Sequence, residues 1–141
     1  MDNQQLTRAH ELRELGELAR NSYDLETAQA HYEQAVTLLR TSDDQLKLAH
    51  TIRHLGDVHA ERRNWPAAEE CLAEALSIYR SHPSPSRLDL ANAIRSHAVL
   101  HTATGQPEKA RALFLEAGDL YRSLGIAAGV EECRRKADQL G

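Results

Sequence analysis

Histidine pairs are the residues of this 141-residue chain that come nearest to a chemical site. His50 and His54 are four residues apart, as are His97 and His101, and this spacing places two imidazoles on one face of a helix, where both could reach one metal ion. The stretch TIRHLGDVH, residues 51–59, adds an aspartate between two histidines. However, the chain has no HExxH motif, and no carboxylate stands at ligand spacing beside a histidine pair. We therefore expect no metal ligands and no cofactor.

The histidine-rich stretch occurs again in the chain, but its histidines do not. Residues 49–59, AHTIRHLGDVH, align with 91–101, ANAIRSHAVLH, and more loosely with 9–19, AHELRELGELA. The three segments share an alanine, an aliphatic residue three positions later and then an arginine, whereas His54 aligns with Ser96. A ligand set would not be lost between copies whose scaffold persists. The repetition therefore favours a structural scaffold, in which several histidines are polar residues of the core.

Nucleophilic catalysis has no support in the sequence. Cys71 and Cys133 fall in segments of helical pattern, and no glycine-rich loop of the kind that cradles phosphates is present. Acidic neighbours such as Glu69 and Glu70 do not face each other on a helix. We expect a protein that is not an enzyme and has no catalytic residues.

Composition and charge narrow the class of protein further. Apolar residues make up 41% and charged residues 27%, but aromatic residues only 4%, which favours closely packed helices over a β-sandwich. The net charge of −4 gives no sign of a nucleic-acid-binding surface. Neither a signal peptide nor an apolar run of about 18 residues is found, so no membrane association is expected. Two cysteines without a CxxC motif indicate reduced thiols and a cytoplasmic protein.

The spacing of small residues predicts three pairs of helices. Gly16 is followed 12 positions later by an alanine, and the same interval follows Gly56 and Ala98. Small residues at fixed points allow two helix backbones to approach closely, while a larger residue fills the remaining space. The predicted core stripes of the first helices are Leu12, Leu15, Gly16, Ala19; Ile52, Leu55, Gly56, His59; and Ile94, His97, Ala98, His101. Those of the second helices are Ala28, Tyr32, Ala35; Ala68, Leu72, Ala75; and Ala110, Phe114, Ala117.

The same residues carry a family resemblance. The segments LRELGELA…ETAQAHYEQA, IRHLGDVH…AAEECLAEA and, with a degenerate first helix, IRSHAVLH…EKARALFLEA resemble the tetratricopeptide repeat. The resemblance implies a right-handed α-solenoid of helix–turn–helix units. The copies are 40 residues apart from Gly16 to Gly56, and 42 apart from Gly56 to Ala98, against about 34 in the usual form. This longer form is similar to arrays in kinesin light chains and beside bacterial transcription regulators.

The expected organisation is a single all-α domain over residues 1–141, with three repeats and a last helix that caps the array. The repeats are expected at about residues 6–41, 45–81 and 86–123, and the capping helix at about 130–140. Gly125 and Gly129 are expected to break the chain before the cap, whose narrow apolar stripe would cover the third repeat.

One polar stripe on the first helices is the candidate site. It consists of His10, Arg13, Glu17, His50, Arg53, Asp57, Asn92, Arg95 and Val99. The resemblance implies that this flank lines a concave groove that holds a partner segment, and arginine suits carboxylates through its bidentate fork. The partner would then be an acidic protein or peptide. The alternative is a stripe that pairs with itself, Arg13 with Glu17 and Arg53 with Asp57, and binds nothing. Arg95 has Val99 in place of that acid, which favours the groove.

The predicted function is that of a non-catalytic adaptor or scaffold that binds a partner in this groove. The alternative is a regulatory or sensor partner of a bacterial signalling or transcription system, which would recognise a folded domain by its convex or end surfaces. The Lys/Asn pattern by which chaperone-binding members of the family grip a terminal carboxylate is absent, so that function is not carried over. Assembly with further copies of the chain is left open.

Overall fold

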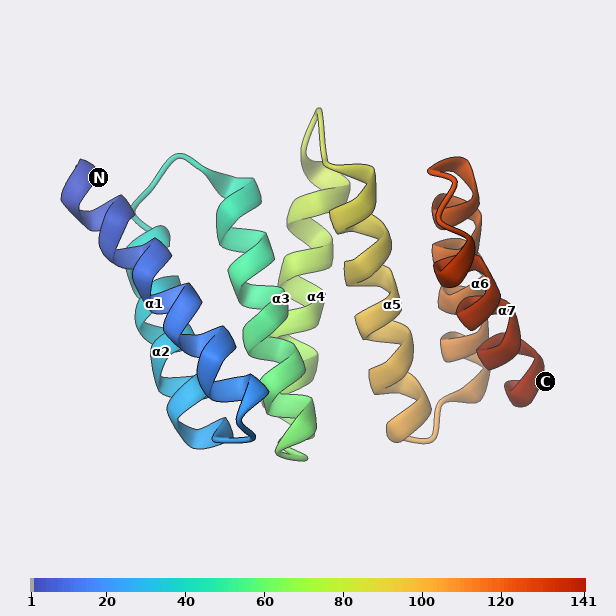
Figure 1. Ribbon diagram of the computed structural model, residues 1–141. Coiled ribbons are helices and arrows are strands. Elements are labelled where there is room, and N and C mark those ends of the chain that lie inside the picture. The colour runs from blue at the N-terminus through green and yellow to red at the C-terminus, as the bar shows by residue number, and fades with distance from the viewer. Residues whose placement is uncertain (1) are drawn as a thin grey trace. The chain divides into compact units, whose positions relative to one another are not determined.

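The computed structural model describes residues 2–141, in which there are seven α-helices and no strand (Figure 1). The helices are α1 (Asn3–Asn21), α2 (Leu25–Leu39), α3 (Gln45–Glu61), α4 (Trp65–Ser81), α5 (Arg87–Ala103), α6 (Pro107–Ser123) and α7 (Ala127–Leu140). They form two compact units, one reaching to Ile78 and the other comprising Tyr79–Gly141, so α4 contributes to both. The predicted all-α class is confirmed. None of these helices combines the length and apolar character needed to cross a membrane.

Short polar side chains set where most of the helices begin. Asp24 precedes α2 and Asp44 precedes α3, and each carboxylate accepts a hydrogen bond from the backbone N–H three residues later, at 3.3 and 3.0 Å. Ser86 does the same for α5 at 3.2 Å. These bonds satisfy backbone donors that the first turn of a helix leaves unpaired. Pro107 begins α6, where its missing N–H costs nothing.

Four turns in the chain share one backbone geometry. The residue with a positive φ is Tyr23 (60°), Arg63 (61°), Gly105 (74°) or Gly125 (72°). In each turn the next N–H bonds to a carbonyl five residues earlier, at 2.8 to 2.9 Å, in the pattern that closes a helix end. Three of these turns join the first and second helices of the predicted pairs. The fourth joins α6 to α7, so α7 follows α6 as closely as α2 follows α1.

The small residues predicted at helix crossings are where two helices touch in unit 1. A Cβ atom on Gly16 of α1 would lie 3.0 Å from the ring of Tyr32 on α2. A Cβ on Gly56 of α3 would lie 2.7 Å from Cδ2 of Leu72 on α4. Glycine is therefore needed at both positions for packing. Leu15 departs from the prediction, because its side chain is exposed.

The last helix begins earlier than predicted, and Gly129 does not break the chain. The helix starts at Ala127 and passes through Gly129 without interruption. A Cβ atom at position 129 would lie 2.6 Å from Cγ of Tyr121 on α6, so the glycine serves the close approach of α6 and α7. Cys133 and Ala137 are the buried residues of α7.

Arginines at the ends of second helices form ion pairs with glutamates of the next second helix. Arg40 donates two hydrogen bonds to the carboxylate of Glu74, at 2.7 and 2.9 Å, within unit 1. Arg80 donates two to Glu116, at 2.8 and 2.9 Å, within unit 2. This bidentate geometry fixes the register between neighbouring helices.

Candidate partner-binding surface

Four residues of the predicted stripe lie around one cavity in unit 1. The cavity has a volume of about 180 Å³. It is lined by residues of α1, α2 and α3, namely His10, Arg13, Glu14, Glu17, Tyr32, His50 and His54. Arg20 on α1 also donates a hydrogen bond to Glu61 on α3, at 2.7 Å, which holds these two helices beside each other. The cavity thus lies on the flank of α1 and α3 that carries the predicted stripe.

Arg13 is the available cation of this cavity. Within residues 2–141 no ion pair joins Arg13 to Glu17, although the two stand four residues apart on α1. Glu14, which the stripe did not include, is instead 2.6 Å from Nε2 of His10. Arg13 thus lines the cavity and forms no ion pair within the described chain, although Glu14 and Glu17 line the same cavity. Its planar guanidinium is suited to bind a carboxylate through two hydrogen bonds.

The aromatic wall of the cavity is a cluster that sequence reasoning did not find. The ring of His54 stacks on that of Tyr32, with centroids 5.8 Å apart and planes 9° from parallel. His50 lies edge-on to His54 at 4.6 Å. The only sequence signal was the four-residue spacing of the two histidines, because nothing in the sequence links Tyr32 to either of them.

The protonation of His54 follows from its neighbours. Its Nε2 atom is 3.3 Å from Nη2 of Arg53, which can only donate, so Nε2 is an acceptor and the ring proton is on Nδ1. Burial, followed by the Arg53 cation, lowers the pKa of His54 to about 2. His54 is therefore a neutral, flat wall of the cavity and not a cation near neutral pH.

The side chain of Arg53 is mostly buried and forms an ion pair. Its Nη1 lies 3.2 Å from Oδ2 of Asp57, and the two side chains are only 12% and 17% exposed. Neither residue lines the cavity. At this position the arginine and the acid of the stripe pair with each other, which is the pairing that the alternative interpretation expected.

Arg95 has a partner, which corrects the expectation drawn from Val99. Arg95 on α5 donates through Nε to the carboxylate of Glu132 on α7. The acid comes from a helix 37 residues further along the chain, so the i, i+4 rule could not reveal it. Asn92 is also engaged, since its Oδ1 accepts a hydrogen bond from the hydroxyl of Tyr121 at 2.5 Å. In unit 2 these stripe residues hold α6 and α7 on α5, whereas Val99 is exposed.

A pH-dependent contribution to stability is expected from this ion pair. The hydrogen bond from Arg95 lowers the pKa of Glu132 below its ordinary value of 4.5. A lowered pKa in the folded state stabilises the fold above the unfolded value, and this contribution is lost as pH falls through the folded value. Glu132→Gln should therefore lower the free energy of unfolding at pH 7 by up to about 1 kcal/mol, and this difference from the wild type should be smaller near pH 2.5. Thermal melts at the two pH values measure this. Glu131→Gln, on the exposed face of α7, is the control, and equal melting of wild type and Glu132→Gln at pH 7 would contradict the role of the pair.

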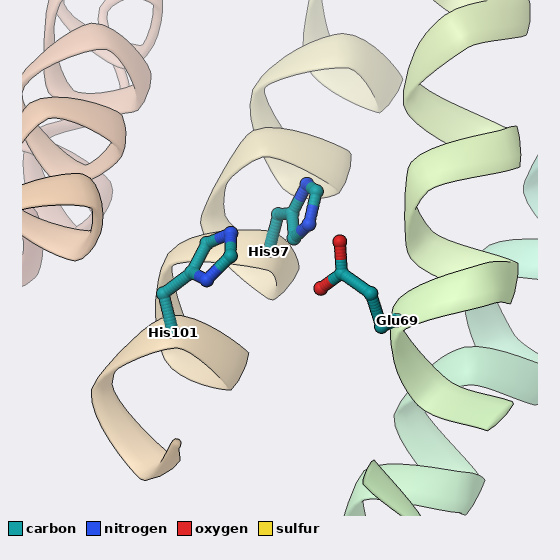
Figure 2. A group of neighbouring side chains, drawn as sticks. All are labelled: Glu69, His97 and His101. Atoms are coloured by element: carbon teal, nitrogen blue, oxygen red, sulfur yellow. The ribbon is translucent and has the colours of Figure 1, made fainter. Parts of the chain in front are cut away.

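The second histidine pair lies on one face of α5, as its spacing predicted. The imidazoles of His97 and His101 project from successive turns (Figure 2). Their centroids are 4.6 Å apart, and the rings are stacked at 21°. Both are buried, as is His59 on α3, so these three histidines occupy the core positions that the predicted stripes gave them.

Helix pairs closed by short turns, crossing at small residues and repeating about every 40 residues, define the class of helical-repeat proteins. The chain belongs to the tetratricopeptide repeat family: the family model described as "Tetratricopeptide repeat" matches residues 7–81 and 48–123. The recognition made from the sequence is thereby confirmed. Members of this family are typically non-catalytic and serve as adaptors in protein–protein interactions.

Solved structures agree on the fold. The chain is similar to the N-terminal domain of stress-induced protein-1 (STI-1) from C. elegans, with 18% identity and a TM-score of 0.68, over 94% of this chain and 99% of that one. It is also similar to BtubC (BKLC) from P. vanneervenii, with 18% identity and a TM-score of 0.63, over 94% of this chain and 62% of that one. At these identities the likeness concerns the fold alone. No sequence among the curated proteins matches the chain.

Proposed function

We propose that the chain is a non-catalytic adaptor that binds a segment of a partner protein across α1 and α3, with a carboxylate of the partner on Arg13. The observation that carries this proposal is the cavity of unit 1, which is lined by His10, Arg13, Glu17 and His50. The guanidinium of Arg13 has no ion-pair partner in the described chain. The charge of arginine persists at all ordinary pH values, so the attraction does not depend on the histidines.

The size of the cavity determines what enters it. A volume of about 180 Å³ is below the roughly 300–1,000 Å³ of sites that enclose a small molecule. It accommodates one side chain, for which Tyr32 and His54 offer flat rings and Arg13 offers hydrogen-bond donors. One side chain provides little affinity by itself, so the remaining contacts come from a segment that lies along the exposed surface of both helices.

The proposal assigns different roles to the nine stripe residues. His10, Arg13, Glu17 and His50 contact the partner because they line the cavity. The other five are Arg53, Asp57, Asn92, Arg95 and Val99. Four of these are engaged within their own unit, and the proposal gives them a structural role; Val99 is left as an exposed side chain.

Reversing the charge of Arg13 tests the proposal. Arg13→Glu should weaken binding of a partner captured from cell extract by about 10- to 100-fold, since a hydrogen-bonded charge contributes about 1.5–3 kcal/mol. Binding is measured by titrating the isolated partner against each variant, at low and at high salt. The free energy of unfolding, obtained from thermal melts, should stay within about 0.5 kcal/mol of that of the wild type, because Arg13 makes no ion pair within the described chain.

Arg63→Glu is the matched control. Arg63 is exposed in the turn after α3, in the same unit, and its reversal changes the net charge by the same amount. If both variants bind like the wild type, the partner binds elsewhere. If both lose affinity to the same extent, the attraction is nonspecific and depends on overall charge.

A further inference from the structure

The ion pairs at the ends of the second helices follow a register that extends beyond the two that are formed. Arg40 and Arg80 are 40 residues apart, and their acceptors Glu74 and Glu116 are 42 apart, the intervals that also separate the repeats. In each pair an arginine at the end of one even-numbered helix holds a glutamate near the middle of the next. The charge pattern therefore belongs to the repeat and not to one contact.

Arg122 stands at the next position of this register, 42 residues after Arg80. It lies at the end of α6, and its one ion-pair partner among residues 2–141 is Asp119 of its own helix, at 2.9 Å, with the two side chains 66% and 79% exposed. No glutamate from a later helix reaches it within the described residues. An exposed pair at i, i+3 contributes little, so the guanidinium can exchange Asp119 for a better-placed carboxylate.

A cavity of about 390 Å³ adjoins Arg122 at the turn between α6 and α7. Half-buried Ile126 and Val130 supply apolar surface there. Arg134 and Glu131 of the same helix also line the cavity, and within the described part of the chain Arg134 forms an ion pair with Glu131 alone. We call these four residues, Arg122, Ile126, Val130 and Arg134, the turn surface. Its volume is enough for large aliphatic side chains, and its cations favour an acidic neighbour.

We propose that the turn surface binds a helix of a partner protein, which places a glutamate on Arg122 and aliphatic side chains on Ile126 and Val130. The pairs Arg40–Glu74 and Arg80–Glu116 show the geometry that this contact adopts: two parallel N–H···O bonds from one guanidinium to one carboxylate. This surface is separate from the cavity of unit 1, and neither proposal depends on the other.

A second copy of this chain, stacked on the turn surface by its α2 in the register of the repeats, does not supply the matching group. One register step before Glu74, the residue on α2 is Gln34, as the alignment of Ala35 with Ala75 shows. A neutral amide presents one acceptor oxygen to the guanidinium and cannot form the bidentate pair. The occupant therefore comes from another protein, and self-association becomes an outcome of the test.

The experiment uses a helix of known complementarity as its probe. A labelled peptide with the sequence of residues 65–81, which contains Glu74, and with Cys71→Ser to prevent oxidation, is titrated against the full chain. Binding should weaken at least about 10-fold for Arg122→Glu, and equally for the Glu74→Arg peptide against the wild-type chain. The two reversed partners together should regain most of the affinity, because the ion pair is then restored with its direction exchanged. Arg135→Glu, on the exposed face of α7, is the control and should bind like wild type.

Three results would overturn the proposal. The first is no binding of the peptide at millimolar concentration. The second is binding that is indifferent to Arg122, which would place the peptide elsewhere on the chain. The third is concentration-dependent association of the full chain that Arg122→Glu abolishes, since the occupant would then be a second copy.

Discussion

Removal of residues 126–141 is expected to convert the chain into one that associates or precipitates. The deletion takes away α7, whose buried Cys133 and Ala137 lie on the apolar surface of unit 2. Tyr121 loses the backbone of Gly129 from its ring, and exposing one such large side chain costs on the order of 2 kcal/mol. Arg95 also loses Glu132. A repeat array without its terminal cap presents its last apolar face to water, where it drives association.

Size-exclusion chromatography with light scattering, followed by thermal melting, measures this effect. The control is the full chain with Glu131→Gln and Arg135→Gln, which changes only exposed side chains of α7. This variant should keep the size and melting of the wild type. If the truncated chain is as stable as the intact one and has the same number of chains per particle, α7 is an appendage and its contacts on α6 do not stabilise the fold.

Among substitutions that add one methyl group to a residue of unit 2, Gly129→Ala is expected to reduce stability most. The new Cβ would lie 2.6 to 2.9 Å from three ring atoms of Tyr121, so α7 or the ring must move. Overpacking of this kind costs about 1–3 kcal/mol. Alanine gains at most about 1 kcal/mol over glycine within a helix, which does not offset that cost. Movement of the ring would also strain the hydrogen bond from Tyr121 to Asn92.

Gly118→Ala is the matched control, because Gly118 lies on α6 and also faces α7. A Cβ there would be 3.3 Å from Cβ of Cys133, a contact that a shift of a few tenths of an ångström relieves. Its melting temperature should equal or slightly exceed that of the wild type, while that of Gly129→Ala falls. If both variants melt like the wild type, the close approach of α6 and α7 is looser than the structure indicates.

Much of the fold could be predicted from the sequence because its determinants are local or strictly periodic. Asp24 and Asp44 begin helices through bonds to residues three positions away, which any reader of the sequence can anticipate. Gly16 and Gly56 recur at one spacing and predict the helix crossings that the structure contains. Gly129 misled the prediction because a glycine that permits a turn and a glycine that permits close packing are the same letter in a sequence.

The candidate site could be predicted only in part. Arg13 and His50 belong to a periodic stripe, so the sequence places them on one flank, and the cavity brings them together. The partner of Arg95 is an acid on another helix, outside any short-range rule, and it reversed the argument that rested on Val99. Tyr32 was assigned to the core by its spacing, but its ring also forms a wall of the cavity.

The paired arginines and glutamates also give the array a direction. In both pairs the donor belongs to the earlier helix and the acceptor to the later one, Arg40 to Glu74 and Arg80 to Glu116. The middle helix pair, α3 and α4, carries both an acceptor, Glu74, and a donor, Arg80. A second copy of this pair, inserted in frame, would find a counter-ion on each side, and its deletion would remove one charge of each sign. The first pair has Gln34 in place of the acceptor, so these charges favour a change in length at the middle of the array over one at its start.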